Sequence, residues 1–356
     1  VETIKGTNGK DIELTIDTTI QTILNDELKN TYEKFKADNV SAVLIDAKNG
    51  DIIAMGSYPT FDPNNISVSK QEDRKNRVAL DIFEPGSTFK PFIVAKALSD
   101  GKINKDTMFN TRPYTIGKFP VRDTHVYEQL TTTGIIQKSS NVGTSKIIAK
   151  YPRKEVHEFF SDIGVGHRMK QIPFYQGSRK IKSADKWGDL DVAVMSFGYS
   201  LEMNLLQLAR AYTMFTTDGK LLPLRLIKGE KSEDEVKQMI TPKAAKDMRE
   251  MLHIVTLKGG TATMLNLDGF NAAAKTGTAR KVVNGKYSPN QHSGLLVGFA
   301  PYENPQFIMA IRVDSPKQGG YYGGVVSSDL FNNVGKEFLR KRGTIPTEKP
   351  SEEKIK

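Results

Sequence analysis

The chain contains no cysteine and only one tryptophan among its 356 residues. Without cysteine it cannot form disulfides, thiolate metal sites or a cysteine nucleophile. Its five histidines show no metal-ligand spacing, and no glycine-rich phosphate-binding pattern is present. The apolar runs are far too short to span a membrane. These absences disfavour thiol, metal and nucleotide chemistry, so we expect no metal and no cofactor.

The formal net charge is +10, with 38% hydrophobic and 26% charged residues. Apart from the basic excess, this composition is ordinary for a globular protein. No aromatic series interleaves the densest basic stretch, so a solvated face is favoured over a nucleic-acid site. An anionic membrane or an acidic polymer stays open as a partner of that stretch. Its cations are Arg168, Lys170, Arg179, Lys180, Lys182 and Lys186.

Strand patterns at the two ends of the chain bracket a middle that is mostly helical. Asn-Gly at 49–50, between two β-rich runs, predicts a hairpin. We predict an α+β fold, with one five-stranded antiparallel sheet flanked by helices and a helical subdomain. The predicted strands are 13–16, 41–46, 51–55, 271–280, 293–300 and 305–314. The predicted helices are 20–35, a helix after Ser87, 133–150, 205–216, 242–257 and 328–342.

The stretch Glu84–Phe92 reads as a turn that delivers a serine to the start of a helix. Lys90 follows Ser87 by three residues, so both project from one helix face. A serine hydroxyl is a weak nucleophile until a neighbour takes its proton. A lysine can take it when burial or a nearby cation lowers its pKa. Ser-x-x-Lys occurs five times in the chain, however, and a capping serine with a solvated lysine fits it equally well.

Two further short motifs accompany the first. Ser139-Ser140-Asn141 falls inside the predicted 133–150 helix, and Lys275-Thr276-Gly277-Thr278 falls on a predicted strand. Small residues flank the second, so another segment can approach that strand closely. Alone, Gly277 could equally mark a bulge. Together and in this order, the three motifs are those of penicillin-binding proteins and class A β-lactamases.

The chain resembles class B penicillin-binding proteins over about Glu13–Arg342, above all the septal, FtsI-like peptidoglycan D,D-transpeptidases. It departs from their pattern at Ser200, where Gly is usual, and at Asn204-Leu205, where Thr-Pro is usual. Asn can cap the helix that begins there. The segments that carry the resemblance are Glu84–Pro91, Leu130–Ser145, Met195–Ala211, Lys275–Lys281 and Tyr321–Ser327.

The resemblance implies one transpeptidase domain over residues 1–343. Residues 344–356 are rich in Pro, Glu and Lys, and we expect them to form a disordered tail. The resemblance also implies an N-terminal anchor and pedestal that this chain lacks. The domain would then lie at the periplasmic face of a bacterial inner membrane.

The resemblance also assigns roles to the motif residues. Ser87 would attack the carbonyl between two D-alanines, with Lys90 as its base. Ser139 would relay a proton to the leaving D-alanine, and Asn141 would hold Lys90 and the substrate amide. Lys275 would place positive charge beside Ser139 and help to keep Lys90 neutral by like-charge repulsion.

Substrate binding is assigned in the same way. The hydroxyls of Thr276 and Thr278 would bind the terminal carboxylate, beside Gly277 on a strand that pairs with the substrate. The backbone N–H groups of Ser87 and Thr278 would form the oxyanion hole. The side chains of Tyr321 and Tyr322 would form an aromatic wall, although core packing fits them nearly as well.

The implied partners are peptidoglycan stem peptides, β-lactam antibiotics and division proteins that include a SEDS-type glycosyltransferase, with no nucleic acid. A β-lactamase or a D,D-carboxypeptidase could use the same site. A β-lactam sensor or a division scaffold would leave it unused. Rapid turnover of a cephalosporin would favour the lactamase.

Overall fold

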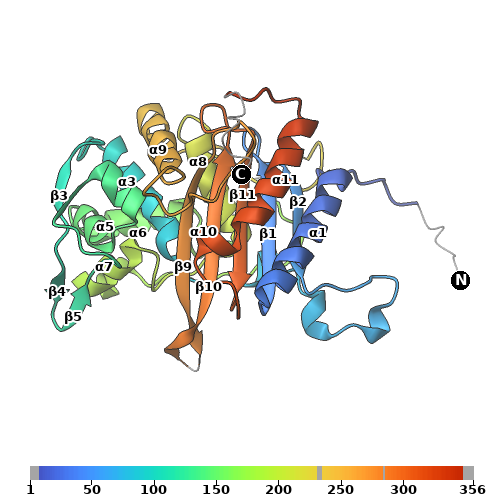
Figure 1. The fold of residues 1–356 in the computed structure, drawn as a ribbon, viewed down its shortest axis with the longest axis horizontal. Coiled ribbons are helices and arrows are strands. Elements are labelled where there is room, and N and C mark those ends of the chain that lie inside the picture. Colours follow the sequence, from blue (N-terminus) through green and yellow to red (C-terminus); the bar gives the residue numbers. More distant parts are fainter. Residues whose placement is uncertain (1–7, 231–234, 284, 348–356) are drawn as a thin grey trace, which may run out of the picture.

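The computed structural model describes residues 8–230, 235–283 and 285–347 (Figure 1). Its centre is a five-stranded antiparallel sheet in the order β2-β1-β11-β10-β9, so the predicted sheet is confirmed. The first and last thirds of the chain meet where β1 pairs with β11. The edge strand β9 carries the Lys-Thr-Gly motif. The strands are β1 (Asn39–Asp46), β2 (Ile52–Tyr58), β9 (Ala273–Val283), β10 (Lys286–Ala300) and β11 (Phe307–Asp314).

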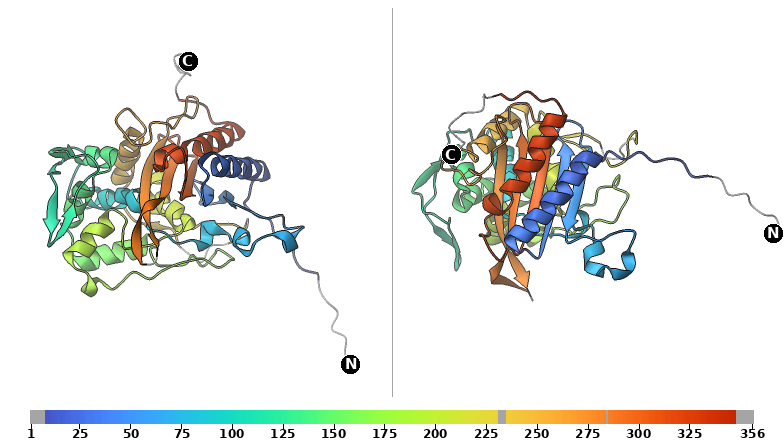
Figure 2. Two further views of the ribbon diagram at one scale, coloured as in Figure 1. Left: turned by 60° about the horizontal axis from the view of Figure 1, so that its bottom comes forward. Right: turned by 45° about the vertical axis from the view of Figure 1, so that its right-hand side comes forward.

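Helices cover both faces of the sheet. α1 (Thr18–Phe35) and α11 (Ser328–Lys341) lie side by side on one face, as Figure 2 shows from two directions. Asp17 caps α1 as predicted, because its side chain accepts hydrogen bonds from the N–H groups of Thr19 and Ile20. α8 (Leu205–Thr216) packs on the other face, against β11 and β1.

The helical half of the molecule lies beside β9 (Figure 1). Its apolar core is continuous with the core under the sheet, joining Phe92 and Phe160 to Val43 and Ile308. Its helices are α3 (Lys90–Ser99), α4 (Thr132–Lys138), α5 (Asn141–Ile148), α6 (Arg153–Asp162), α7 (Asp189–Ser196) and α9 (Pro242–Ile254). The short α2 (Arg77–Leu80) packs on β1, β2 and α8, and α10 (Gly323–Val326) packs on β10 and β9. Two short strand pairs complete it: β3 (Met108–Asn110) with β6 (Gln129–Thr131), and β4 (Tyr114–Ile116) with β5 (Phe119–Val121). A third pair, β7 (Lys220–Leu221) with β8 (Lys237–Gln238), lies next to α8.

Two local predictions were wrong. Residues 13–16 form a single bridge, from Leu14 to Ile227, rather than a strand. The predicted 133–150 helix is two helices, because Ser139 adopts a left-handed conformation (φ 59°) that ends α4. Ser140 then caps α5 by accepting a hydrogen bond from the Gly143 N–H at 2.9 Å. Most of the expected tail, residues 348–356, lies outside the described residues.

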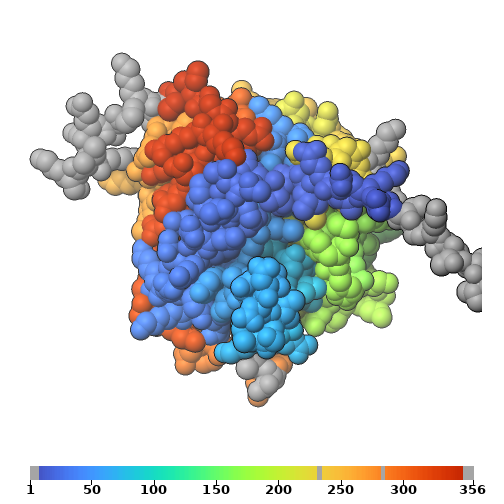
Figure 3. Space-filling view, turned by 90° about the vertical axis from the view of Figure 1, so that its right-hand side faces the viewer, coloured from blue at the N-terminus to red at the C-terminus, as the bar shows by residue number. Residues whose placement is uncertain are grey.

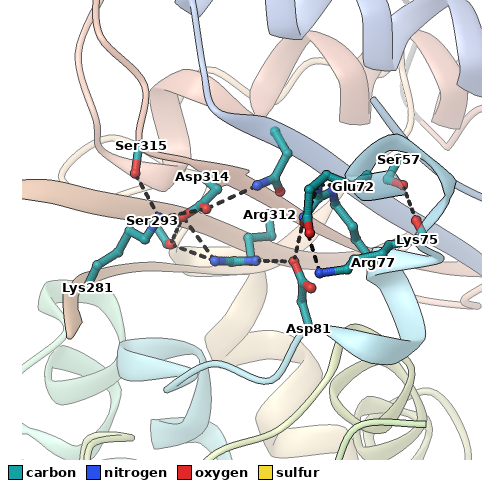
Figure 4. Close-up of polar contacts among 11 residues, drawn as sticks. Ser57, Glu72, Lys75, Arg77, Asp81, Lys281, Ser293, Arg312, Asp314 and Ser315 are labelled. Carbon is teal, nitrogen blue, oxygen red and sulfur yellow. Dashed lines mark hydrogen bonds and ion pairs between the residues drawn. The ribbon is translucent and has the colours of Figure 1, made fainter. Parts of the chain in front are cut away.

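An ionic network ties the segment before the serine turn to the sheet (Figure 4). Arg312 contacts Asp314 at 3.0 Å and Asp81 at 3.3 Å, and Lys281 contacts Asp314 at 2.9 Å. Burial alone would raise the pKa of Asp314, but the charges of Arg312 and Lys281 hold it below its ordinary value. Each cation on the sheet in this network is therefore neutralised by a carboxylate. Across the described ranges, no helix is both long and apolar enough to cross a membrane.

Candidate active site

Ser87 lies on a tight turn of 3-10 helix, η3 (Gly86–Phe89), which leads directly into α3. The Gly86 N–H donates to the carbonyl of Gly198 at 3.0 Å. A Cβ atom at Gly198 would lie 2.1 Å from the Gly86 carbonyl oxygen, so only glycine allows this approach. The Ser-Phe-Gly-Tyr segment at 196–199 therefore supports the serine turn through backbone contacts.

The same turn packs against β9. A Cβ atom at Gly277 would lie 3.1 Å from Cγ2 of Thr88 and 3.2 Å from the carbonyl oxygen of Pro85. The close approach that the small residues predict is present, and the approaching segment is η3. Because β9 is the edge of the sheet, its outer side has no neighbouring strand in that sheet.

Two buried lysines converge on the Ser139 hydroxyl. Lys90 of α3 and Lys275 of β9 are both fully buried, with 0% of their surface exposed. Their Nζ atoms lie 3.1 Å and 3.0 Å from Oγ of Ser139. Lys90 also donates to the Ser139 carbonyl, and Lys275 to the Thr276 carbonyl at 3.0 Å. Three segments far apart in the sequence thus meet at one hydroxyl.

The burial of these lysines lowers their affinity for protons. Burial, reinforced by the positive charge of Lys275, holds the pKa of Lys90 well below its ordinary value, with Asp123 opposing the shift. Burial lowers the pKa of Lys275 from 10.5 to about 7. A neutral Lys90 amine can accept a proton from a hydroxyl, while Ser139 accepts a hydrogen bond from Lys275. Both lysines of the cluster therefore hold a proton less tightly than an exposed lysine does.

Asp123 is a site residue that the sequence reading missed. Its carboxylate accepts hydrogen bonds from Oγ of Ser140 at 2.6 Å and from the backbone N–H groups of Asn141 and Val142 at 2.6 Å and 3.0 Å. It caps the start of α5 from the loop between β5 and β6. Its spacing to the Ser-x-Asn motif gave no signal, because the contact depends on how that loop folds back.

Asn141 makes a different contact from the one we expected. Its Nδ2 donates to the carbonyl of Arg122 at 3.0 Å. Both hydrogen bonds of the Lys90 side chain go to Ser139. Within the part of the chain that the structure describes, the expected Asn141–Lys90 hydrogen bond is therefore not formed.

The two threonines of the strand motif differ in their surroundings. The Thr276 hydroxyl lies 2.6 Å from the hydroxyl of Thr261, in the loop after α9. Thr278 is half-buried and pairs with Gly294 of β10. A Cβ atom at Gly86 would lie 4.0 Å from the Thr278 carbonyl oxygen, so the backbones of the serine turn and the strand lie close together.

The side chains of Tyr321 and Tyr322 are exposed, so the alternative that they pack in the core was wrong. Their exposed fractions are 39% and 54%, and their ring centroids lie 4.6 Å apart. Tyr321 stacks on His292 of β10 at 4.4 Å. A Cβ atom at Gly323 would lie 2.6 Å from the Gly277 carbonyl oxygen, so this segment lies against β9.

The described residues contain no group of three or more His, Cys, Asp or Glu side chains that could hold a metal. The cluster is instead a serine and lysine site on an α+β fold. Residues 40–336 match the penicillin binding protein transpeptidase domain family, and the chain belongs to that family.

Named relatives agree with this assignment. The chain is 45% identical over 340 residues to a probable peptidoglycan D,D-transpeptidase PenA of Neisseria flavescens, covering 96% of this chain and 85% of the relative. It is 34% identical over 350 residues to the peptidoglycan D,D-transpeptidase FtsI of Escherichia coli K12, covering 97% and 59%. It spans 58% of the length of the PenA relative from Neisseria gonorrhoeae. The predicted family is therefore confirmed.

Solved structures show the same fold. The transpeptidase domain of Burkholderia pseudomallei penicillin-binding protein 3 superimposes with a TM-score of 0.85 at 32% identity, covering 96% of this chain and 99% of that one. A protein from Burkholderia ambifaria described as a peptidoglycan glycosyltransferase gives a TM-score of 0.83, also at 32% identity, covering 95% and 100%.

Proposed function

We propose that this chain is the catalytic domain of a serine D,D-transpeptidase that cross-links peptidoglycan stem peptides. The observation that carries the proposal is the pair of buried lysines on one serine hydroxyl, beside the turn that bears Ser87. A buried lysine without a carboxylate partner costs stability. A reaction that needs a neutral amine would explain why such a lysine is buried here.

In the first step, Ser87 Oγ attacks the carbonyl carbon between the two terminal D-alanines. Its proton passes to Lys90 Nζ as the new C–O bond forms. The C–N bond then breaks, and the terminal D-alanine leaves with a proton delivered through Ser139. Lys275 stabilises the negative charge that develops beside that hydroxyl. The product is an acyl ester on Ser87.

In the second step, an amine from a neighbouring stem attacks the ester carbonyl. The amine loses its proton to the Lys90 and Ser139 pair. As the Ser87–acyl bond breaks, Lys90 returns a proton to Ser87 Oγ and the serine hydroxyl is regenerated. The products are a new amide cross-link and the free enzyme. Backbone N–H groups of Ser87 and Thr278 would hold the oxyanion in both steps, at about 3 kcal/mol for each donor.

Donor binding uses the open edge of β9. An extended peptide would add to the edge as a further strand beside Gly277, with the hydroxyls of Thr276 and Thr278 toward its terminal carboxylate. Asn141 would turn toward the substrate amide when substrate displaces its contact with Arg122. Tyr321 and Tyr322 would form the aromatic wall of this site.

The wider setting of the enzyme is also a proposal. The FtsI relatives favour a role in division, at the periplasmic face of an inner membrane, with residues 1–343 as the transpeptidase domain. Division proteins, among them a SEDS-type glycosyltransferase, would be its partners. β-Lactams would acylate Ser87 because they mimic the donor.

The test is to incubate the protein with a labelled penicillin and to map the adduct by mass spectrometry. We expect a single adduct on Ser87, absent in Ser87→Ala. No adduct, or an adduct on another serine, would overturn the proposal. Slow acylation without turnover distinguishes a transpeptidase from a β-lactamase, and cross-linked product from a donor and an acceptor distinguishes it from a carboxypeptidase.

A further inference from the structure

The basic stretch singled out in the sequence forms an ordered surface next to the serine turn. It lies between α6 and α7 and has little regular secondary structure. Buried Gln176 fixes one of its loops through hydrogen bonds with the backbone of Met169 at 2.8 Å and 3.1 Å. The Gly177 N–H donates to the Ala79 carbonyl at 2.9 Å. Figure 3 shows the green chain of this region reaching the face that carries the light-blue residues before the serine turn.

The helix cap at Asn204 holds the same stretch. Asn204 Nδ2 donates to the Gly177 carbonyl at 3.0 Å, and Gln207 Nε2 donates to the Gly164 carbonyl at 3.3 Å. These residues also form the capping box of α8. The backbone that carries the basic side chains is therefore held by hydrogen bonds to two other parts of the fold.

A groove of about 500 Å³ is lined by this stretch together with Glu84 and the segment Ser200–Glu202. The basic stretch contributes Arg179, Lys180 and Lys182 to the lining, and the carboxylates of Glu84 and Glu202 line the groove as well. Glu84 is three residues before Ser87 and directly precedes Pro85, the residue that caps η3. None of the residues that line the groove belongs to β9, so the groove is separate from the strand that would bind the donor.

The charges in the groove do not cancel. Arg179 pairs with Glu202 at 3.0 Å. Lys180 and Lys182 are exposed and form no ion pair within the described ranges. Burial raises the pKa of Glu84, whose Oε1 accepts hydrogen bonds from the Ser200 N–H at 2.8 Å and the Tyr287 hydroxyl at 3.0 Å. The free charge of the groove is thus positive.

We propose that this groove binds the carboxylates of the acceptor stem peptide. The inference rests on the proposed function, because it needs a second peptidoglycan strand at the site. Stem peptides carry free carboxylates, and two unpaired lysines in a groove that Glu84 also lines complement them. The donor would occupy the β9 edge, so the second strand would approach from the groove side.

The test compares two double variants that change the net charge equally. The first, Lys180→Glu with Lys182→Glu, reverses the charge of two side chains that line the groove. The control, Lys29→Glu with Lys118→Glu, reverses the charge of two exposed lysines that likewise form no ion pair in the described parts of the chain. Both proteins are first acylated with penicillin, which reports the proposed function separately. Binding is then measured to uncross-linked peptidoglycan, native or with its stem carboxylates amidated, at two salt concentrations.

We expect the groove variant to bind native peptidoglycan about tenfold more weakly, with a smaller salt dependence, as for two lost charge contacts. Binding to the amidated polymer should not change, and the control pair should match the parent. With a soluble donor and acceptor, release of D-alanine by the donor alone should be unaffected while cross-linking slows.

Three results would overturn the inference even where penicillin acylation is normal. The first is equal binding of native peptidoglycan by the two double variants. The second is an equal loss in the donor-only reaction, which would place the donor in the groove. The third is a loss of binding to vesicles of anionic phospholipid without a loss for peptidoglycan, which would assign the stretch to the membrane surface.

Discussion

Two lysines on the same strand place a cation in two different environments, one half-buried and one fully buried. Lys281, near one end of β9, pairs with Asp314 at 2.9 Å in a network that includes Arg312. Lys275, six residues earlier, is fully buried and faces a serine hydroxyl and a second lysine. The first arrangement is an ion pair that supports the fold. The second costs stability and lowers the pKa of both lysines, that of Lys275 to about 7.

The largest expected effect comes from removing the proposed base. Lys90→Met replaces the amine by an apolar side chain of similar length in a fully buried position. We expect penicillin acylation to slow about 10³-fold, within the range for general-base catalysis. Thermal stability should hold or rise, because the cost of burying an amine disappears. Stopped-flow acylation and thermal unfolding of the same preparation measure both, and an unfolded variant or a normal rate would contradict the account.

The matched change in the ion-pair network of Arg312 and Asp314 should lower stability and leave acylation nearly unchanged. Arg312→Met leaves Asp314 and Asp81 without a shared buried partner. We expect a loss of about 3 kcal/mol in the free energy of unfolding, as for other broken buried pairs. Acylation by the remaining folded protein should stay within severalfold of the parent. Denaturant unfolding and active-site titration would show whether the Arg312 network serves stability while the lysine cluster serves catalysis.

The pH dependence of stability should have a different origin in each cluster. Lys275 has its pKa lowered from 10.5 to about 7, so between these values the unfolded chain holds a proton that the folded chain has released. Its contribution makes stability rise with pH across that window. Lys275→Met should flatten this rise in denaturant unfolding at a series of pH values, whereas Lys281→Met should leave it in place.

Asp314 contributes at the acid end. Its folded pKa lies below the ordinary 3.8, so its stabilisation is fully present above that value and is lost as the pH falls through the folded pKa. Asp314→Asn should remove this acid-side loss without changing the behaviour above pH 7. An unchanged acid limb in this variant would show that the network does not hold Asp314 ionised.

The smallest expected loss of stability comes from an ordinary polar contact that lies away from both clusters. Asn204→Ala removes the N-cap of α8 and its hydrogen bond to Gly177. We expect about 1 kcal/mol of destabilisation, typical of a lost cap. Asn204→Ser, which can still cap, should recover most of it in thermal unfolding, and a full-size loss in this variant would assign the effect to packing.

The sequence predicted the elements that depend on local patterns. The β-rich runs that became β1, β2, β9, β10 and β11 and the capped helix α1 are read directly from apolar periodicity and turn residues. The strand order could not be read in this way, because the pairing of β1 with β11 joins residues that are far apart in the sequence. The family likeness, rather than periodicity, supplied the set of site residues.

What the sequence missed at the site lies in backbone conformation and in loop contacts. The left-handed Ser139 interrupts an apolar pattern that otherwise predicts one continuous helix. Asp123 reaches the start of α5 only because the loop before β6 folds back over it. The Asn141 contact with Arg122 likewise depends on that loop. Each is a tertiary interaction without a local signature.

The central claim is that Lys90 is a neutral amine in the folded protein at neutral pH. The most direct test is NMR of the lysine side-chain ¹⁵Nζ and ¹³Cε resonances, with Lys90 assigned by comparison with Lys90→Met. We expect the chemical shifts of an uncharged amine for Lys90 at pH 7.5. An ammonium signal for Lys90 at that pH would contradict it.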